Sequence, residues 1–225
     1  MIEYPFYENF VNKRVDKIIN IFGEDWFANK SLLELGACQG DVGIHFMKLG
    51  ADVLFSDVRE ENLNAIFDKI NFTPNTKIIN QNLEYNLKCK FDLVLHMGVL
   101  YHIENWKKDL ECALNHSQLM ILESKVNPVP NSRDSFYDAE DFKYDGYQCR
   151  QPIFTQESVE NTLSNLSCKF IRFDNFELNC DWGWVDKNQK IRHVYDWNYD
   201  NYQSIKREDG PNRTTWFKRF WLVLK

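Results

Sequence analysis

Three glycines and an aspartate are the residues of this chain whose types and spacing most clearly indicate ligand chemistry. Gly36, Gly40 and Gly43 follow a short apolar run, and Asp57 ends the next one. Glycines let a backbone turn sharply and approach a ligand with no Cβ in the way. A carboxylate can accept two charge-assisted hydrogen bonds at once. The stretch from Ser31 to Asp57 therefore predicts a strand, a turn, a helix and a second strand that bind a nucleotide.

The spacing of the glycines separates two kinds of nucleotide fold. A dinucleotide fold requires G-x-G-x-x-G at this turn, whereas this chain reads E-x-G-x-x-x-G. That arrangement resembles the first motif of class I S-adenosylmethionine (SAM) dependent methyltransferases. The resemblance implies that the turn backbone lies against the methionine half of SAM and that the acid after the second strand takes both ribose hydroxyls. The cofactor-binding residues implied here are Glu34, Gly36, Ala37, Cys38, Gly40, Asp57 and Val58.

Cys38 departs from the motif, because many relatives have glycine at this position. A side chain therefore stands in the middle of the turn. We expect the ligand to sit slightly off the turn for this reason.

A second motif, FDLVLHMGVLYHI, spans residues 91–103. Residues 93–97 read as a buried strand that leads to Gly98, beyond the carboxyl end where open α/β sheets place ligands. The sequence resembles the fourth motif of the same methyltransferases. Its GVLYH part is similar to enzymes that modify the wobble uridine of tRNA and to several small-molecule methyltransferases. The resemblance implies that Met97 and Gly98 line the methyl-transfer centre.

The two histidines of this motif receive different interpretations. His102 is the candidate catalytic residue, a general base, because the unperturbed pKa of histidine lies near neutrality. The alternative is that His102 caps the following helix or bonds a backbone group. His96, within the apolar strand, is interpreted as a core histidine whose ring nitrogens are satisfied.

Two further polar positions follow predicted strands. Lys77 to Asn80 reads as a third strand, and in the resembled family the residue after it is commonly an aspartate that contacts the adenine amino group. Asn82, with Leu83 beside it, is carried into this cofactor-binding role, since an amide oxygen can imitate the carboxylate. Glu123 ends a fifth strand, where it either faces a substrate or forms a salt bridge or helix cap.

Alternating strands and helices must position these residues. The first is an amphipathic helix over Tyr7 to Phe22, within an N-terminal helical segment of residues 1–30. Alternation without a sequence repeat predicts an α/β fold with a doubly wound sheet. We predict one domain, residues 1–225, on a seven-stranded Rossmann-like sheet that is mainly parallel and ends in an antiparallel strand, Trp216 to Leu224.

Local signals mark where helices start and stop. Asp41 stands where the N-cap of the first helix after the turn is expected, and Gly50 supplies its left-handed end. Thr155 is expected to cap a later helix, with Phe154 packed against Val159.

Two stretches, residues 125–151 and 177–215, break this pattern and read as irregular insertions. Loops of this length are uncommon in compact domains and often bind ligands. The second carries six large rings, which either stack on a flat or anionic substrate or give the insertion a small core of its own. Both insertions follow strands at their carboxyl ends, so we expect them to lie together there and form the acceptor pocket.

Composition limits the partners. The net charge is −6, which argues against nonspecific nucleic-acid binding. Residues 181–225 nevertheless hold nine Lys and Arg against six Asp and Glu, an excess of positive charge that is compatible with an anionic substrate.

The six cysteines lack a C-x-x-C pair and read as reduced thiols, so no metal site is expected. No window is long and apolar enough for a membrane span, and a cytoplasmic protein is expected.

These features predict a SAM-dependent methyltransferase that acts on an unidentified acceptor, a small molecule in the favoured interpretation. One alternative is a tRNA wobble-uridine-type modifying enzyme with an RNA acceptor. Another is a catalytically silent SAM-fold protein that acts as a binding partner. The sequence carries no signal for the oligomeric state.

Overall fold

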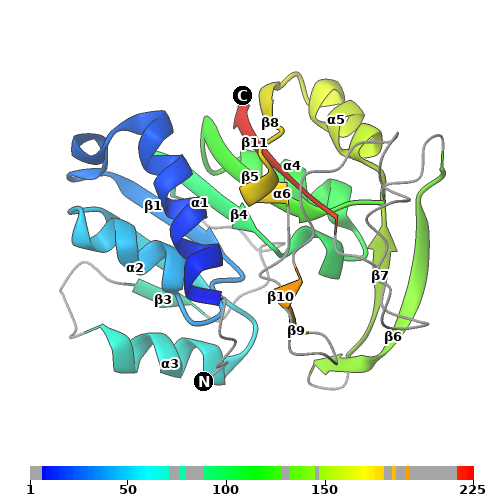
Figure 1. Ribbon diagram of the computed structural model, residues 1–225, viewed down its shortest axis with the longest axis horizontal. Helices are drawn as coiled ribbons and strands as arrows, with labels where there is room; N and C mark the ends of the chain where they lie inside the picture. Colours follow the sequence, from blue (N-terminus) through cyan, green and yellow to red (C-terminus); the bar gives the residue numbers. More distant parts are fainter. Residues whose placement is uncertain are drawn as a thin grey trace.

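A central sheet organises the protein, as seen in a computed structural model that describes residues 7–70, 77–79, 89–127, 132–144, 147–179, 184–185, 191–192 and 217–225 (Figure 1). Seven strands lie in the order β3-β2-β1-β4-β5-β11-β8. Strands β1 to β5 pair in parallel, and β11 runs antiparallel to both β5 and β8. The predicted Rossmann-like fold, with its antiparallel final strand, is confirmed. The strands are β1 Ser31–Leu35, β2 Asp52–Ser56, β3 Lys77–Ile79, β4 Leu93–Met97, β5 Leu119–Lys125, β8 Lys169–Phe173 and β11 Lys218–Leu224.

Helices cover both faces of the sheet, as a doubly wound fold requires. Buried side chains of α1, α2 and α3 share one apolar cluster with one face of the sheet, and those of α4 and α5 share a second cluster with the other face. The helices are α1 Tyr7–Phe22, α2 Asp41–Lys48, α3 Glu60–Lys69, α4 Trp106–Leu114, α5 Gln156–Asn165 and α6 Phe176–Asn179, with the short 3₁₀ turns η1 Glu24–Phe27 and η2 Leu100–His102. Parallel strands sandwiched in this way place their carboxyl ends at one common edge.

The predicted helix signals are correct in two cases and wrong in one. Thr155 Oγ1 accepts a hydrogen bond from Ser158 N at 3.0 Å, and Gly50 adopts a left-handed φ of 91°. Asp41, however, is the first residue of α2 and its N-cap is Gly40. The helix starts one residue earlier than predicted because Ile44 N already donates to Gly40 O, at 2.9 Å.

The first insertion differs from the irregular loop predicted for residues 125–151. β5 extends to Lys125, and an antiparallel ribbon follows, formed by β6 Ser135–Tyr144 and β7 Tyr147–Ile153 (Figure 1). The polar and acidic residues of this stretch interrupt the alternation of apolar and polar residues that indicates a strand. The second insertion includes another small hairpin, β9 Trp184–Val185 and β10 Ile191–Arg192. Most of residues 177–215 lies outside the described residues.

No helix within the described ranges is long and apolar enough to cross a membrane.

Candidate active site

The turn between β1 and α2 packs directly against the segment that follows β4. Gly36 has a φ of +58°, and a Cβ added to it would overlap Val99 Cγ2. Both features require glycine at this position. Val99 follows Gly98, which is itself left-handed with a φ of +75°. The two motifs identified in the sequence therefore meet at the carboxyl edge of the sheet.

Cys38 occupies the turn in a left-handed conformation, with a φ of +50°. A non-glycine residue rarely adopts this region. The conformation directs the Cys38 backbone N toward Asp57, to which it donates a hydrogen bond of 2.8 Å. Burial, followed by the charge of Asp57, raises the pKa of the Cys38 thiol. The thiol is therefore the protonated form at neutral pH, and the backbone rather than the sulfur supplies the polar contact.

Asp57 is buried immediately after β2 and accepts three hydrogen bonds. Its Oδ2 accepts from Cys38 N at 2.8 Å, and its Oδ1 accepts from Arg59 N at 2.9 Å and from Asn62 Nδ2 at 3.1 Å. A carboxylate has about four acceptor positions, so about one remains. The carboxylate is thus fixed by the turn, by its own chain and by α3.

Glu34 lies behind the turn rather than along it. Its side chain is buried, and Oε2 accepts a hydrogen bond from Gly43 N at 3.0 Å. Burial raises the pKa of Glu34 to about 8, an effect that the hydrogen bond from Gly43 opposes and that the charges of Asp41 and Asp57 increase. A Cβ at Gly43 would overlap this carboxyl group. Glu34 therefore supports the first turn of α2.

The remaining predicted cofactor residues fall into two groups. Val58 is 43% exposed beside Asp57. Half-buried Met97 ends β4, and half-buried Gly98 follows it. Ala37 is buried in the turn, where its N donates to Ser56 O at 3.0 Å. Asn82 and Leu83 lie outside the described residues.

His102 ends η2, where the first insertion reaches it. Its Nδ1 lies 3.0 Å from Nε2 of Gln151, on β7. Burial lowers the pKa of His102 to about 4, and the positive charges of Lys125, Arg59 and Lys218 lower it further. The imidazole is therefore neutral at pH 7. An amide that donates to Nδ1 leaves the ring proton on Nε2.

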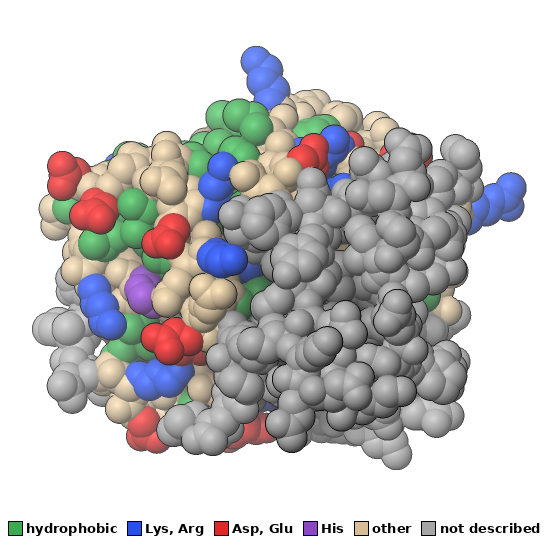
Figure 2. Space-filling model, viewed as in Figure 1, with side chains coloured by type: hydrophobic (Ala, Val, Ile, Leu, Met, Phe, Trp, Pro, Cys, Tyr) green, Lys and Arg blue, Asp and Glu red, His purple; other side chains and the backbone are tan. Residues whose placement is uncertain are grey.

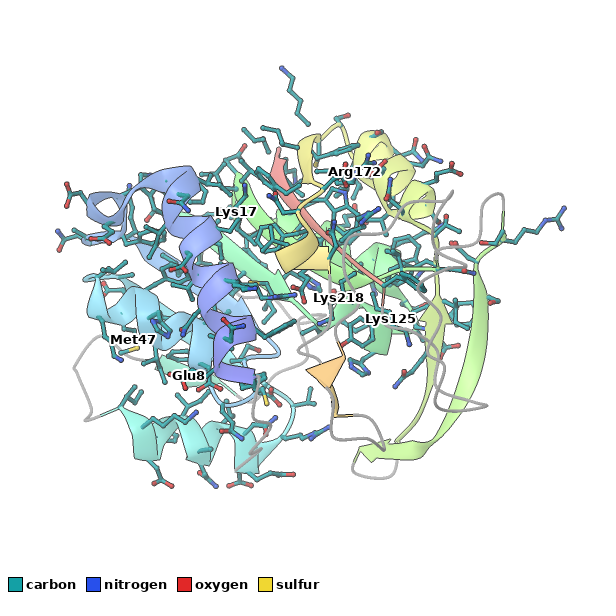
Figure 3. The ribbon with its side chains drawn as sticks, viewed as in Figure 1. Glu8, Lys17, Met47, Lys125, Arg172 and Lys218 are labelled. Carbon is teal, nitrogen blue, oxygen red and sulfur yellow. The ribbon has the colours of Figure 1, made fainter. Side chains whose placement is uncertain are left out.

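Glu123 forms a buried ion-pair network, as one of its two sequence interpretations held. Its carboxylate contacts Arg14 Nε of α1 and lies 3.0 Å from Lys218 Nζ of β11. All three side chains are at most 4% exposed. The two cations lower the pKa of Glu123 against the opposing effect of burial. Lys218 pairs in register with Lys125, and Figure 3 shows the two beside one another.

His96 meets its sequence interpretation only in part. It is fully buried, and its Nε2 lies 2.6 Å from Asp109 Oδ2 of α4. Its Nδ1 has no partner among the described residues.

The sequence reasoning missed four residues at this edge: Arg14, Asn62, Val99 and Gln151. Arg14 carried a signal, because a charge within the apolar stripe of an amphipathic helix predicts a buried partner. Arg14 also donates to the carbonyls of Phe10 and Leu178, at 3.1 Å each, and so joins α1 to α6. The other three carried no signal in local spacing.

The face shown in Figure 2 carries no patch of a single charge sign among its described residues. On the face formed by α1, α2 and α3, acidic and basic side chains are interspersed rather than gathered by sign (Figure 2). No group of three or more potential metal-ligating side chains occurs in the part of the chain that the structure describes.

Comparison with known proteins identifies the family. A family model described as lysine methyltransferase matches residues 7–131. The fold is similar to that of the N-terminal domain of EvdMO1 with SAH bound, with a TM-score of 0.61, 16% identity and coverage of 96% of this chain and 80% of that chain. It is also similar to magnesium protoporphyrin IX methyltransferase from Synechocystis PCC 6803 with bound SAM, with a TM-score of 0.59, 12% identity and coverage of 98% and 80%.

Two other comparisons differ greatly in extent. A putative S-adenosylmethionine dependent methyltransferase from Listeria monocytogenes has a TM-score of 0.60 and 12% identity, with coverage of 94% of this chain and 98% of that chain. A sex-determining transformer protein 2 of Caenorhabditis elegans is 33% identical over 70 residues, which are 31% of this chain and 4% of that protein. The last match is too short to bear on the function of the chain.

Proposed function

The chain belongs to the lysine methyltransferase family, and from this premise we propose that it transfers the methyl group of SAM to a small-molecule acceptor. The observation that carries the proposal is the bond between Cys38 N and Asp57 Oδ2, at 2.8 Å. It joins the glycine turn to the acid after β2. Gly36, packed on Val99, brings the end of β4 to the same place.

The residues present fit SAM in shape and charge. The turn at Gly36 has no room for a side chain, so its backbone is open to close approach by a ligand. Asp57 keeps about one acceptor position for a ribose hydroxyl, and exposed Val58 offers an apolar surface for a flat base. The acids Glu34, Asp41 and Asp57 gather on this side of the edge. Of these, Glu34 is protonated at neutral pH and Asp41 pairs with Lys69, so Asp57 is the carboxylate that suits a cofactor with a positive sulfonium.

The chemistry requires positioning more than reactive groups. When bound, SAM would supply an electrophilic methyl carbon on a sulfonium sulfur that leaves as a neutral thioether. The protein must align the acceptor with that carbon, and alignment contributes about 7–11 kcal/mol in well-oriented reactions. We assign this task to the segment from Met97 to His102, which lies against the turn.

We propose that neutral His102 binds or deprotonates the acceptor. Gln151 engages Nδ1, so Nε2 is the ring nitrogen that we assign to the acceptor. A pKa near 4 makes His102 a weak base, since general bases work best with a pKa near the operating pH. The role that fits better is therefore orientation of an acceptor through a hydrogen bond.

Charge favours a neutral or anionic small molecule over a protein lysine, the second candidate, which the family description suggests. Lys125, Arg59 and Lys218 act electrostatically on His102, and Glu123 is already engaged by two cations. An ammonium group would be repelled there. The tRNA alternative rests on the GVLYH motif alone, and the silent-protein alternative predicts SAM binding without transfer.

An assay with methyl-labelled SAM and cell extract, separated into small-molecule, protein and RNA fractions, tests these functions. We expect label in the small-molecule fraction, and less of it with the Asp57→Ala variant, which binds SAM more weakly. Label in protein would support the lysine acceptor, and label in RNA would support the wobble-uridine alternative. Binding of SAM with no transfer to any fraction would support the silent protein.

We also propose a cytoplasmic location. Four described cysteines, Cys38, Cys89, Cys112 and Cys168, are free thiols. Thiols persist in reducing compartments such as the cytosol.

A further inference from the structure

The side chain of Asn62 occupies an acceptor position of Asp57 that the proposed function requires. Asp57 has about four acceptor positions, and Cys38 N, Arg59 N and Asn62 Nδ2 fill three of them. Two ribose hydroxyls that donate to this carboxylate need two positions. About one is open, so one existing donor must leave.

The three donors differ in their freedom to leave. Cys38 N is a backbone group of the left-handed turn, and Arg59 N is a backbone group two residues from Asp57 itself. Moving either would require a backbone change at the site. Asn62 is a half-buried side chain in the first turn of α3. A rotation about its side-chain bonds is sufficient to release Oδ1 of Asp57.

The chemistry also fixes which end of the Asn62 amide faces Asp57. An ionised carboxylate accepts hydrogen bonds only, so the amide must present its NH₂ group, as the 3.1 Å contact has it. The Asn62 amide therefore donates to Oδ1 of Asp57 as a ribose hydroxyl would. The protein holds the carboxylate in one orientation before a ligand arrives.

We propose that Asn62 is a positioning residue that competes with a ribose hydroxyl for Asp57 Oδ1 and so sets the affinity for the cofactor. The inference rests on the proposed function, because it takes Asp57 as the ribose acceptor. When the cofactor binds, the hydrogen bond from Asn62 to Asp57 is replaced by one from a ribose hydroxyl. The binding free energy gained from that hydroxyl is therefore reduced by the net free energy of the bond that is lost. A variant without the amide binds the cofactor more tightly.

Calorimetry with S-adenosylhomocysteine (SAH) and its 2′-deoxy and 3′-deoxy analogues tests the proposal on the parent and Asn62→Ala. A hydrogen bond to a charged group contributes about 1.5–3 kcal/mol, so SAH should bind about 10- to 150-fold tighter in the variant. At least one deoxy analogue should lose more affinity in Asn62→Ala than in the parent, because no amide returns to Oδ1. Asn64→Ala, at an exposed position of the same helix, is the matched control and should behave as the parent.

The outcomes separate this inference from the function beneath it. Unchanged or weaker SAH binding in Asn62→Ala, with equal deoxy penalties in both proteins, would overturn the competition while leaving the cofactor site in place. Asn62→Ser, whose side chain is too short for the contact, should repeat the alanine result and guards against a folding effect. Folded parent and variants that all fail to bind SAH would overturn the proposed function and this inference together.

Discussion

The two sides of the sheet's carboxyl edge carry buried carboxyl groups in opposite electrostatic surroundings. On the β1 and β2 side, Glu34 has acids as neighbours and its pKa is raised to about 8. On the β5 and β11 side, Glu123 contacts Arg14 and Lys218, and its pKa is lowered. Burial is the largest influence on both, so the neighbours decide the sign. One edge thus has an acid-lined half at β1 and β2 and a cation-lined half at β5 and β11, which the proposed function assigns to the cofactor and to the acceptor.

The largest effect should follow from removing the charge of Glu123. Glu123→Gln leaves Arg14 and Lys218 buried without this carboxylate, and breaking a buried pair costs about 3–5 kcal/mol. Urea unfolding should show a loss of this size. Glu111→Gln, at an exposed position of α4, should show almost none. An equally small loss of stability in both variants would contradict the importance of the ion pairs of Glu123 on the basic side.

On the acidic side, the corresponding substitution Glu34→Gln should stabilise the protein. The folded state keeps the Glu34 proton to about pH 8, whereas the unfolded chain releases it near 4.5, so the free energy of unfolding falls as the pH rises between these values. Glu34→Gln removes this fall, a gain over the parent of up to about 1.4 kcal/mol per pH unit in that window.

Unfolding curves from pH 5 to pH 8 provide the measurement for Glu34→Gln. Glu60→Gln, at an exposed position in the first turn of α3, is the control and should follow the parent. A Glu34→Gln curve parallel to that of the parent would show that the carboxyl ionises normally in the folded protein.

The smallest effect concerns His102, near the boundary of the two halves. Its folded pKa of about 4 lies below the unfolded value of 6.5, so the stability that it contributes is lost as the pH falls from 6.5 through 4. The ratio of parent to His102→Gln turnover should stay constant from pH 8 to pH 5.5, since the imidazole remains neutral there. A decline of this ratio with a midpoint near 6.5 would show that neither burial nor the positive neighbours lower the pKa of His102.

Local patterns predicted the elements that position the acidic half. The apolar stripe of α1 and the glycine after it gave Tyr7–Phe22, the bounds found in the structure. The order of alternating strands gave the sheet and placed Gly36, Asp57 and Gly98 at one edge. These features depend on residues close together in sequence or on general rules of chain connection.

The basic half depends on pairs far apart in sequence. Arg14 and Glu123 are separated by 109 positions, and Lys218 and Glu123 by 95, so no local spacing indicates them. The β6–β7 ribbon was missed because its sequence lacks a clear alternation of apolar and polar residues. The sequence also predicted that Asp57 follows the second strand. It did not show how the acceptor positions of Asp57 are filled, because that depends on the direction of the Asn62 side chain.

Calorimetric titration of SAH into the parent and Asp57→Ala tests the assignment of the acidic half to SAM most directly. We predict that the parent binds and that the variant binds about 10- to 150-fold more weakly, since a hydrogen bond to a charged group contributes about 1.5–3 kcal/mol. Asp52→Ala, at the exposed first residue of β2, should bind as the parent does. A folded parent that binds neither SAH nor SAM, or an Asp57→Ala variant with the parent's affinity, would contradict the account.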